Sequence, residues 1–175
     1  MDVSYDKIGG TVASLLILWS SIEKAARTQI ALITKKEAPL RVCGSGLLIQ
    51  WRDAVIQDSS PGSLRAELAS SLQEDLCQKI KVRNGLCHGL NAIYSSCPEE
   101  SAKLGWQVKG KSYEMTYPAL QEYFQSIAKA AQAISILSTQ KEGGIESRMD
   151  DIAENREWWL NEFGIRLAVS NTVTS

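Results

Sequence analysis

The sequence predicts an all-α fold, a helical bundle of four to five helices with a small β-hairpin between the third and fourth long elements. Apolar residues recur at alternating three- and four-residue steps through most of the chain, which is the period of a helix with one buried face. Only residues 106–117 show the two-residue period of a strand. A chain of 175 residues has room for one principal domain.

The first predicted helix covers residues 6–34 and contains no proline. Its apolar stripe consists of Ile8, Val12, Leu15, Trp19, Ile22, Ala26, Ile30 and Ile33. A second, shorter helix is expected over residues 47–57, where apolar residues again fall on one side. Residues 58–62 read Asp-Ser-Ser-Pro-Gly, a composition that predicts a turn.

The third predicted helix covers residues 63–89. Ser63 is a suitable N-cap, because its hydroxyl can accept a hydrogen bond from a free amide of the first turn. The apolar stripe follows at four-residue steps: Leu64, Leu68, Leu72, Leu76 and Ile80. Gly89 is expected just beyond the helix end, where glycine is favoured. A polar loop should follow.

The predicted hairpin over residues 106–117 turns at Lys109-Gly110-Lys111. A two-stranded hairpin is marginally stable alone, so it must lie on the helices. Pro118 suits the first turn of a fourth helix, which the apolar pattern extends to Thr139.

The end of the chain has a different pattern. Gly143-Gly144 predicts a hinge, and a last amphipathic helix is expected over residues 145–163, followed by a disordered tail after Ala168. The sequence therefore divides into a helical domain over residues 1–140 and a C-terminal part over residues 141–175.

Composition excludes several classes of function. Nineteen Lys and Arg residues against twenty Asp and Glu residues give a net charge of -1, so the chain lacks the overall basic field of a general nucleic-acid binder. His88 is the single histidine, which excludes mechanisms that need two imidazoles from one chain, such as those of the two-His zinc proteases. We predict no cofactor.

Metal, membrane and export signals are also missing from the sequence pattern. The four cysteines have no paired spacing for a zinc site, so no metal site is predicted. The apolar run over residues 12–19 is too short to span a bilayer. Asp2 and Asp6 precede this run, where a secretory signal would carry positive charge. We therefore expect a cytoplasmic protein with free thiols and no membrane partner.

The one strong charge asymmetry lies at the end of the third predicted helix. No acidic residue occurs between Asp75 and Glu99, and this stretch contains Lys79, Lys81, Arg83 and His88. One interpretation is structural, because cations at a helix end suit the C-terminal dipole. The position of Arg83 on the helix favours the other interpretation, a functional site. Arg83 continues the leucine and isoleucine stripe, where arginine is rare unless it is paired.

The geometry of an ideal helix constrains such a site. Asn84 and His88 are four residues apart, so their side chains are neighbours. Arg83 and His88 are five apart and point about 140° away from each other. They converge only if the helix relaxes near Gly85 or if a second copy of the chain supplies the partner.

The string Arg83-Asn84-Gly85-Leu86-Cys87-His88, followed by Gly89, resembles the R-x(4–6)-H motif of the HEPN superfamily (higher eukaryotes and prokaryotes nucleotide-binding domains). In that family a polar residue, often asparagine, follows the arginine. The order of long helices is also similar, so the resemblance covers about residues 6–140.

The resemblance implies a metal-independent endoribonuclease of the toxin or defence type. Such an enzyme is active as a homodimer with the two motifs facing each other, and it cleaves RNA by attack of a ribose 2′-OH on the scissile phosphate. His88 would act as general base or acid. Arg83 would bind the scissile phosphate, and Asn84 would hold the imidazole or the phosphate.

Other residues would support this site. Lys79 and Lys81 would bind substrate along the RNA backbone, and Lys109 and Lys111 would extend that groove. Glu23 is a candidate partner for Arg83, although it also reads as a surface glutamate beside Arg27.

The resemblance also raises the question of a protein partner. An antitoxin or another regulatory protein is a possible partner, but many toxin members carry a tyrosine two positions after the histidine, where this chain has Leu90. Two alternatives from other classes stay open: a non-catalytic HEPN-like helical interaction or nucleotide-binding module, and an antitoxin-type partner protein.

Overall fold

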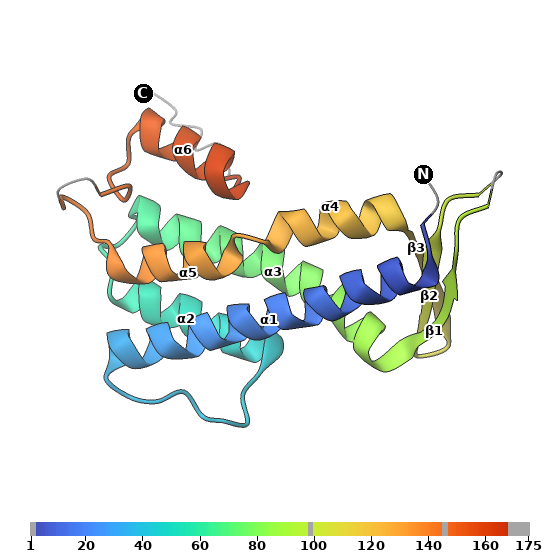
Figure 1. Ribbon diagram of the computed structural model, residues 1–175. Helices are drawn as coiled ribbons and strands as arrows, with labels where there is room; N and C mark the ends of the chain where they lie inside the picture. The colour runs from blue at the N-terminus through green and yellow to red at the C-terminus, as the bar shows by residue number, and fades with distance from the viewer. Residues whose placement is uncertain (1–2, 98–99, 145–146, 168–175) are drawn as a thin grey trace.

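The computed structural model describes residues 3–97, 100–144 and 147–167. These residues form a helical bundle with a small antiparallel sheet at one end, as Figure 1 shows. In chain order the elements are α1 (Tyr5–Thr34), α2 (Gly44–Gln57), α3 (Leu64–Gly89), β1 (Leu90–Tyr94), β2 (Lys103–Val108), β3 (Lys111–Thr116), α4 (Tyr117–Ile127), α5 (Ala130–Thr139) and α6 (Ala153–Phe163). The predicted bundle is confirmed, and the sheet differs in its strands. The expected tail over residues 168–175 lies outside the described residues.

Helix α1 is the longest element and runs along the bundle (Figure 1). Its 30 residues make it about 45 Å long. The Ser4 hydroxyl caps it by accepting from the amide of Lys7 at 3.3 Å. The predicted stripe is buried from Ile8 to Ile30, while Ile33 is partly buried. Helices α2, α4 and α5 pack along this stripe.

Helix α3 begins as predicted, because the Ser63 hydroxyl accepts from the amide of Ala66 at 3.4 Å. Arg65 in its first turn is fully buried, and it was not expected in the core. Its guanidinium donates to the carbonyl oxygens of Leu137 at 2.6 Å and Ser138 at 3.3 Å, and to the Asp58 carboxylate at 3.1 Å. Arg65 therefore joins the start of α3 to the end of α5 by hydrogen bonds.

The single fourth helix expected over residues 118–139 is two helices, α4 and α5. The break has no proline or glycine, and side chains contact the backbone groups beside it. Ser126 donates its hydroxyl to the Tyr123 carbonyl at 2.7 Å, and its own carbonyl accepts from Lys79 at 3.3 Å. The Ala128 amide then bonds to the carbonyl of Gln125, three residues back, so the α-helical ladder is interrupted.

The sheet has three strands in the order β1-β2-β3. The hairpin of β2 and β3 lies at the predicted place, although β2 begins earlier, at Lys103, and Tyr117 is the first residue of α4. Its turn is Lys109-Gly110, where both residues have positive φ (50° and 77°) as a two-residue type I′ turn requires. Strand β1 was predicted as part of a polar loop. It begins directly after α3 and pairs with β2, with Leu90 opposite Trp106.

The last predicted helix starts later than expected, at Ala153. Part of the segment before it is described, and it is a hydrogen-bonded turn. Asp150 accepts from the Gly143 amide at 2.7 Å and, through its carbonyl, from the Asn155 side chain at 2.9 Å. Trp159 of α6 is buried, while Ile152, the residue before the helix, is half-exposed.

Candidate active site at the end of α3

The last two turns of α3 are positioned by two glycines that lie against strand β2. A Cβ atom at Gly85 would overlap the Nε1 and Cδ1 atoms of the Trp106 indole and lie 3.1 Å from its Cε2. A Cβ atom at Gly89 would overlap the main-chain carbonyl oxygen of Gln107. The four-residue spacing places both glycines on one helix face. This face brings α3 close to the sheet and fixes the direction of the neighbouring side chains.

Arg83 points to the opposite side of α3, toward α1. Its guanidinium lies 3.9 Å from the Glu23 carboxylate and donates to the side-chain oxygen of Asn84 at 2.9 Å. The exposed fractions are 27% for the Arg83 side chain and 19% for the Glu23 side chain, so the pair is partly sheltered from water. The Nε atom of Arg83 is buried and has no hydrogen-bond partner among the described residues.

Glu23 is itself held in place by helix α2. Its carboxylate accepts from the main-chain amide of Gly44, the first residue of α2, at 3.3 Å. A carboxylate is favourable there, because the free amides of a helix N-terminus carry partial positive charge. Of the two sequence interpretations of Glu23, the structure therefore supports the partner of Arg83. The neighbouring Arg27 instead donates to the carbonyl oxygens of Pro39, Leu40 and Val42.

Tyr123 of α4 binds the turn of α3 that precedes Arg83, a role that no pattern in the sequence indicates. Its hydroxyl donates to the carbonyl oxygen of Lys79 at 2.7 Å and accepts from the indole Nε1 of Trp19 at 3.1 Å. Burial raises the pKa of Tyr123 to about 12, although hydrogen bonds from Trp19 and from the Arg83 amide oppose the rise. One hydroxyl thus joins α1, α3 and α4 at the start of the motif.

His88 and Asn84 are exposed on the last turns of α3. The helix is continuous to Gly89 and is not relaxed at Gly85. The angle of an ideal helix therefore applies, and Arg83 and His88 of one chain point about 140° apart. The structure brings Arg83, Asn84 and Glu23 together, while His88 stands apart from this group.

The four predicted RNA-binding lysines have different surroundings. Lys79 forms an ion pair with Asp75 at 2.5 Å and reaches the carbonyl of Ser126, so its charge is engaged within the bundle. Lys81 is exposed and donates to the side chain of Gln78. Lys109 and Lys111 are exposed at the turn of the hairpin.

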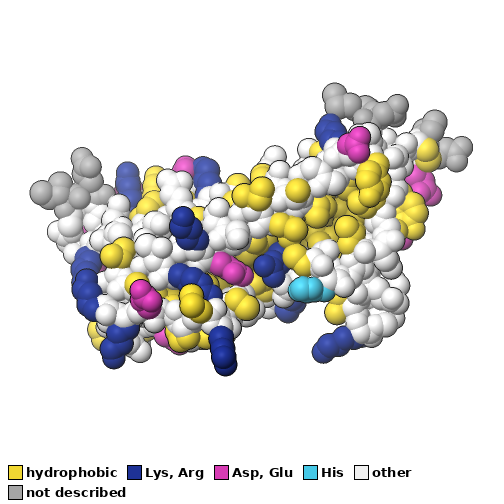
Figure 2. All heavy atoms as spheres, turned by 60° about the horizontal axis from the view of Figure 1, so that its bottom comes forward, with side chains coloured by type: hydrophobic (Ala, Val, Ile, Leu, Met, Phe, Trp, Pro, Cys, Tyr) yellow, Lys and Arg dark blue, Asp and Glu magenta, His cyan; other side chains and the backbone are white. Residues whose placement is uncertain are grey.

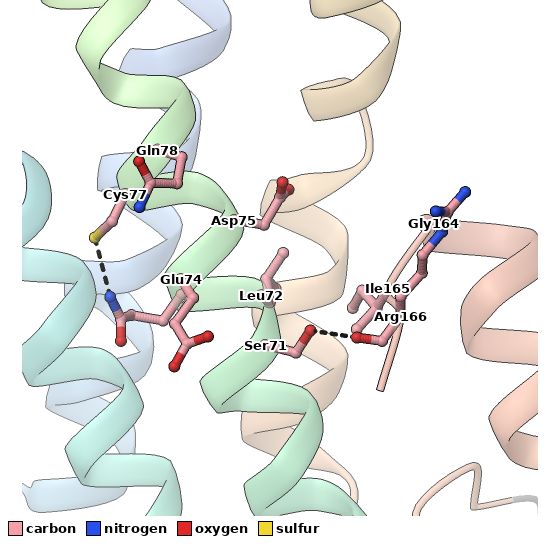
Figure 3. A pocket seen from close by; sticks show the side chains of 10 residues that line it. Ser71, Leu72, Glu74, Asp75, Cys77, Gln78, Gly164, Ile165 and Arg166 are labelled. Carbon is pink, nitrogen blue, oxygen red and sulfur yellow. Dashed lines mark hydrogen bonds between the residues drawn. The ribbon is translucent and has the colours of Figure 1, made fainter. Parts of the chain in front are cut away.

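A pocket of about 760 Å³ lies elsewhere on α3, between its outer side and residues 164–166. Figure 3 shows side chains from both segments around it and the hydrogen bond from the Ser71 hydroxyl to the Arg166 carbonyl, which measures 2.8 Å. Glu74 and Asp75 make its α3 side acidic. This pocket does not suit an anionic substrate, and it is separate from the motif.

Three chemical properties limit what the described residues can do. They contain no cluster of three or more His, Cys, Asp or Glu side chains arranged to hold a metal ion. The four cysteines are free. Within the same ranges, no helix has both the length and the apolar character needed to cross a membrane.

No protein-family model, curated protein or solved structure matches the chain. The interpretation of the site therefore depends on the residues and their geometry.

Proposed function

We propose that the protein is a metal-independent endoribonuclease of the HEPN type that acts as a homodimer, in the cytoplasm where RNA is its substrate. The observation that carries the proposal is the arrangement at the end of α3. An arginine held by Glu23 and Asn84 lies five residues before an exposed histidine, in a segment without acidic residues.

The proposed reaction needs a base, an acid and a group that stabilises charge on phosphorus. One imidazole removes the proton of a ribose 2′-OH, and the 2′ oxygen attacks the adjacent phosphorus. The bond from phosphorus to the 5′ oxygen breaks, and a second imidazole protonates that oxygen. The products are a 2′,3′-cyclic phosphate and a 5′-OH. Arg83 offers several N–H donors to the phosphate oxygens while negative charge accumulates on them.

A second copy of the chain is required by this scheme. Each chain has one histidine, and Arg83 and His88 of the same helix diverge. A twofold axis beside the end of α3 would bring each His88 toward the other copy's motif. Figure 2 shows the histidine at the border of an apolar area of the surface, with an acidic and a basic side chain nearby. Leu90 of β1, two residues after His88, is an exposed apolar side chain of this part of the molecule.

A non-catalytic helical module is the second candidate, and one observation favours it. The ion pair of Arg83 with Glu23 joins α3 to α1, so the arginine has a structural task without any substrate. Under this alternative the purified protein folds and dimerises but leaves RNA intact.

Cleavage of a labelled single-stranded RNA in the presence of EDTA separates the two candidates. We expect wild-type protein to cut the RNA, and His88→Ala to lose about 100-fold or more of the rate, the usual contribution of acid–base catalysis. Arg83→Lys should also lose activity, because an ammonium cannot replace the several N–H donors that a guanidinium holds in one plane. Cys87→Ala changes an exposed neighbour on the same turn and is the matched control, expected to cut at the wild-type rate. Cleavage by His88→Ala at the wild-type rate would contradict the proposal.

A further inference from the structure

The two faces of the sheet carry different aromatic side chains. Directly paired residues of an antiparallel sheet share a face, and residues three apart on one strand lie on opposite faces. Trp106 pairs with Tyr113, and Lys103 pairs with Tyr94. Trp106 and Tyr113 therefore lie on one face, and Tyr94 lies on the other.

Trp106 and Tyr113 connect the sheet to the candidate active site. The Trp106 indole is 6% exposed and lies against Gly85, inside the motif. The ring of Tyr113 is stacked on this indole, with the ring centroids 5.8 Å apart and the planes inclined by 10°. Tyr113 is 44% exposed. It thus presents an open aromatic ring one ring away from the helix that carries Arg83 and His88.

The charge around Tyr113 suits a polyanion. The sequence contains no acidic residue from Ser101 to Tyr113, and Lys109 and Lys111 lie in this stretch. Within the part of the chain that the structure describes, neither lysine forms an ion pair, and Lys111 shares the face of Tyr113. On the other face Lys103 is neutralised by Glu100 at 3.6 Å and Glu114 at 3.4 Å.

We propose that Tyr113 is a stacking platform for an unpaired nucleobase of the bound RNA, with Lys109 and Lys111 bound to the neighbouring phosphates. The proposal rests on the proposed function and makes single-stranded RNA the substrate, because a base in a duplex has no free face to offer. Stacking of a base on an aromatic side chain is sequence-tolerant, so the platform selects unpaired RNA rather than a particular base.

The outer face of the sheet provides a matched control. Tyr94 is 49% exposed, and the ammonium of Lys103 lies 5.5 Å from the centre of its ring. Tyr94 has the same side chain as Tyr113, similar exposure and the same sheet, but it faces away from α3. If any exposed tyrosine of the sheet could bind RNA, substitution of Tyr94 and substitution of Tyr113 would weaken binding equally.

The test measures binding without cleavage, in the His88→Ala background, by fluorescence anisotropy of a labelled single-stranded RNA and of its duplex. We expect tighter binding of the single strand. Tyr113→Ala should weaken that binding by roughly 5- to 150-fold, the range for one base stacked on an aromatic ring. Tyr113→Phe and Tyr94→Ala should bind as the parent does. Lys111→Ala should weaken binding more than Lys103→Ala.

Two additions separate stacking from a structural role of Tyr113. Tyr113→Leu keeps an apolar cover over Trp106 but has no ring, so it should fold and still bind weakly. An RNA with one abasic position should lose as much affinity as Tyr113→Ala, and the two losses should not add. The proposal would be contradicted if Tyr113→Leu bound RNA as tightly as the parent. It would also be contradicted if Tyr94→Ala and Tyr113→Ala lost the same RNA affinity. Cleavage by the wild-type protein is measured in a separate assay, so failure of the platform and failure of the proposed function give different results.

Discussion

Gly85→Ala tests the close approach of α3 to the sheet. The new Cβ would overlap two atoms of the Trp106 indole, which is buried and cannot turn aside into solvent. Overpacking a core typically costs about 1–3 kcal/mol. Alanine is favoured over glycine inside a helix by about 1 kcal/mol, which offsets part of this cost. We therefore expect a net loss of up to about 2 kcal/mol in the free energy of unfolding, where a glycine without this contact would give a gain.

The assay is urea denaturation followed by circular dichroism. Gly10→Ala is the control, because a Cβ there meets no atom within 4 Å and the residue also lies in a helix. It should stabilise the protein by up to about 1 kcal/mol. Gly89→Ala should cost more than Gly85→Ala, since its Cβ would overlap a main-chain oxygen rather than a side chain.

A double variant strengthens the test. Trp106→Leu removes the indole, so adding Gly85→Ala to it should cost far less than adding Gly85→Ala to the wild type. The packing of α3 on β2 would be refuted if Gly85→Ala were as stable as Gly10→Ala, or if its cost were the same with and without Trp106.

Three further predictions concern single side chains. Tyr123→Phe should lower the free energy of unfolding by about 1–3 kcal/mol, measured by urea denaturation, because it leaves a buried indole N–H without an acceptor; an unchanged midpoint would contradict the bridging role of the hydroxyl. Burial alone would raise the pKa of Asp58, but hydrogen bonds from Lys141 and Arg65 outweigh it and hold that pKa below its ordinary value. The carboxylate therefore stabilises the fold above about pH 4 and loses this effect as the pH falls through its folded pKa, so Asp58→Asn should flatten the acid side of a plot of melting temperature against pH. Glu23→Gln should reduce RNA cleavage less than Arg83→Ala does and cost at most about 1 kcal/mol of stability, because the partly exposed ion pair is lost while an oxygen remains to accept from α2.

Most of the helical part of the fold follows from local patterns, which were sufficient to predict the three long helices at the start of the chain. The stripe of α1 and the Ser63 cap depend on residues within a few turns of one another. The hairpin turn at Lys109-Gly110 was recognised for the same reason, because glycine there accepts a positive φ. Gly89, expected just beyond the end of α3, is its last residue and has no positive φ, and its lack of a side chain instead allows the close approach to β2.

The features that were missed depend on contacts between distant segments. Strand β1 is five residues long and has no turn signal before it, so only its pairing with β2 makes it a strand. The break between α4 and α5 lies where Lys79, which is far away in the sequence, donates to the Ser126 carbonyl. Tyr123 and Arg65 likewise gain their roles from partners on other helices.

The candidate site was predictable in its residues but not in its geometry. Charge, helical phase and the motif select Arg83, Asn84 and His88 as candidates, and their role in a site stays a prediction. The ion pair with Glu23 was one of two interpretations, and it depends on how α1 crosses α3. No sequence pattern indicated that glycines inside the motif lie against Trp106, and this contact leads from the motif to Tyr113.

The most direct test of the proposed chemistry compares two substrates for the purified wild-type protein in EDTA. One is a single-stranded RNA, and the other is the same strand with a 2′-deoxy sugar at the cleavage position. We expect the RNA to be cut to a 2′,3′-cyclic phosphate and the substituted strand to stay intact at that position. An uncut RNA, or equal cleavage of both strands, would contradict a ribonuclease that works through the 2′-OH.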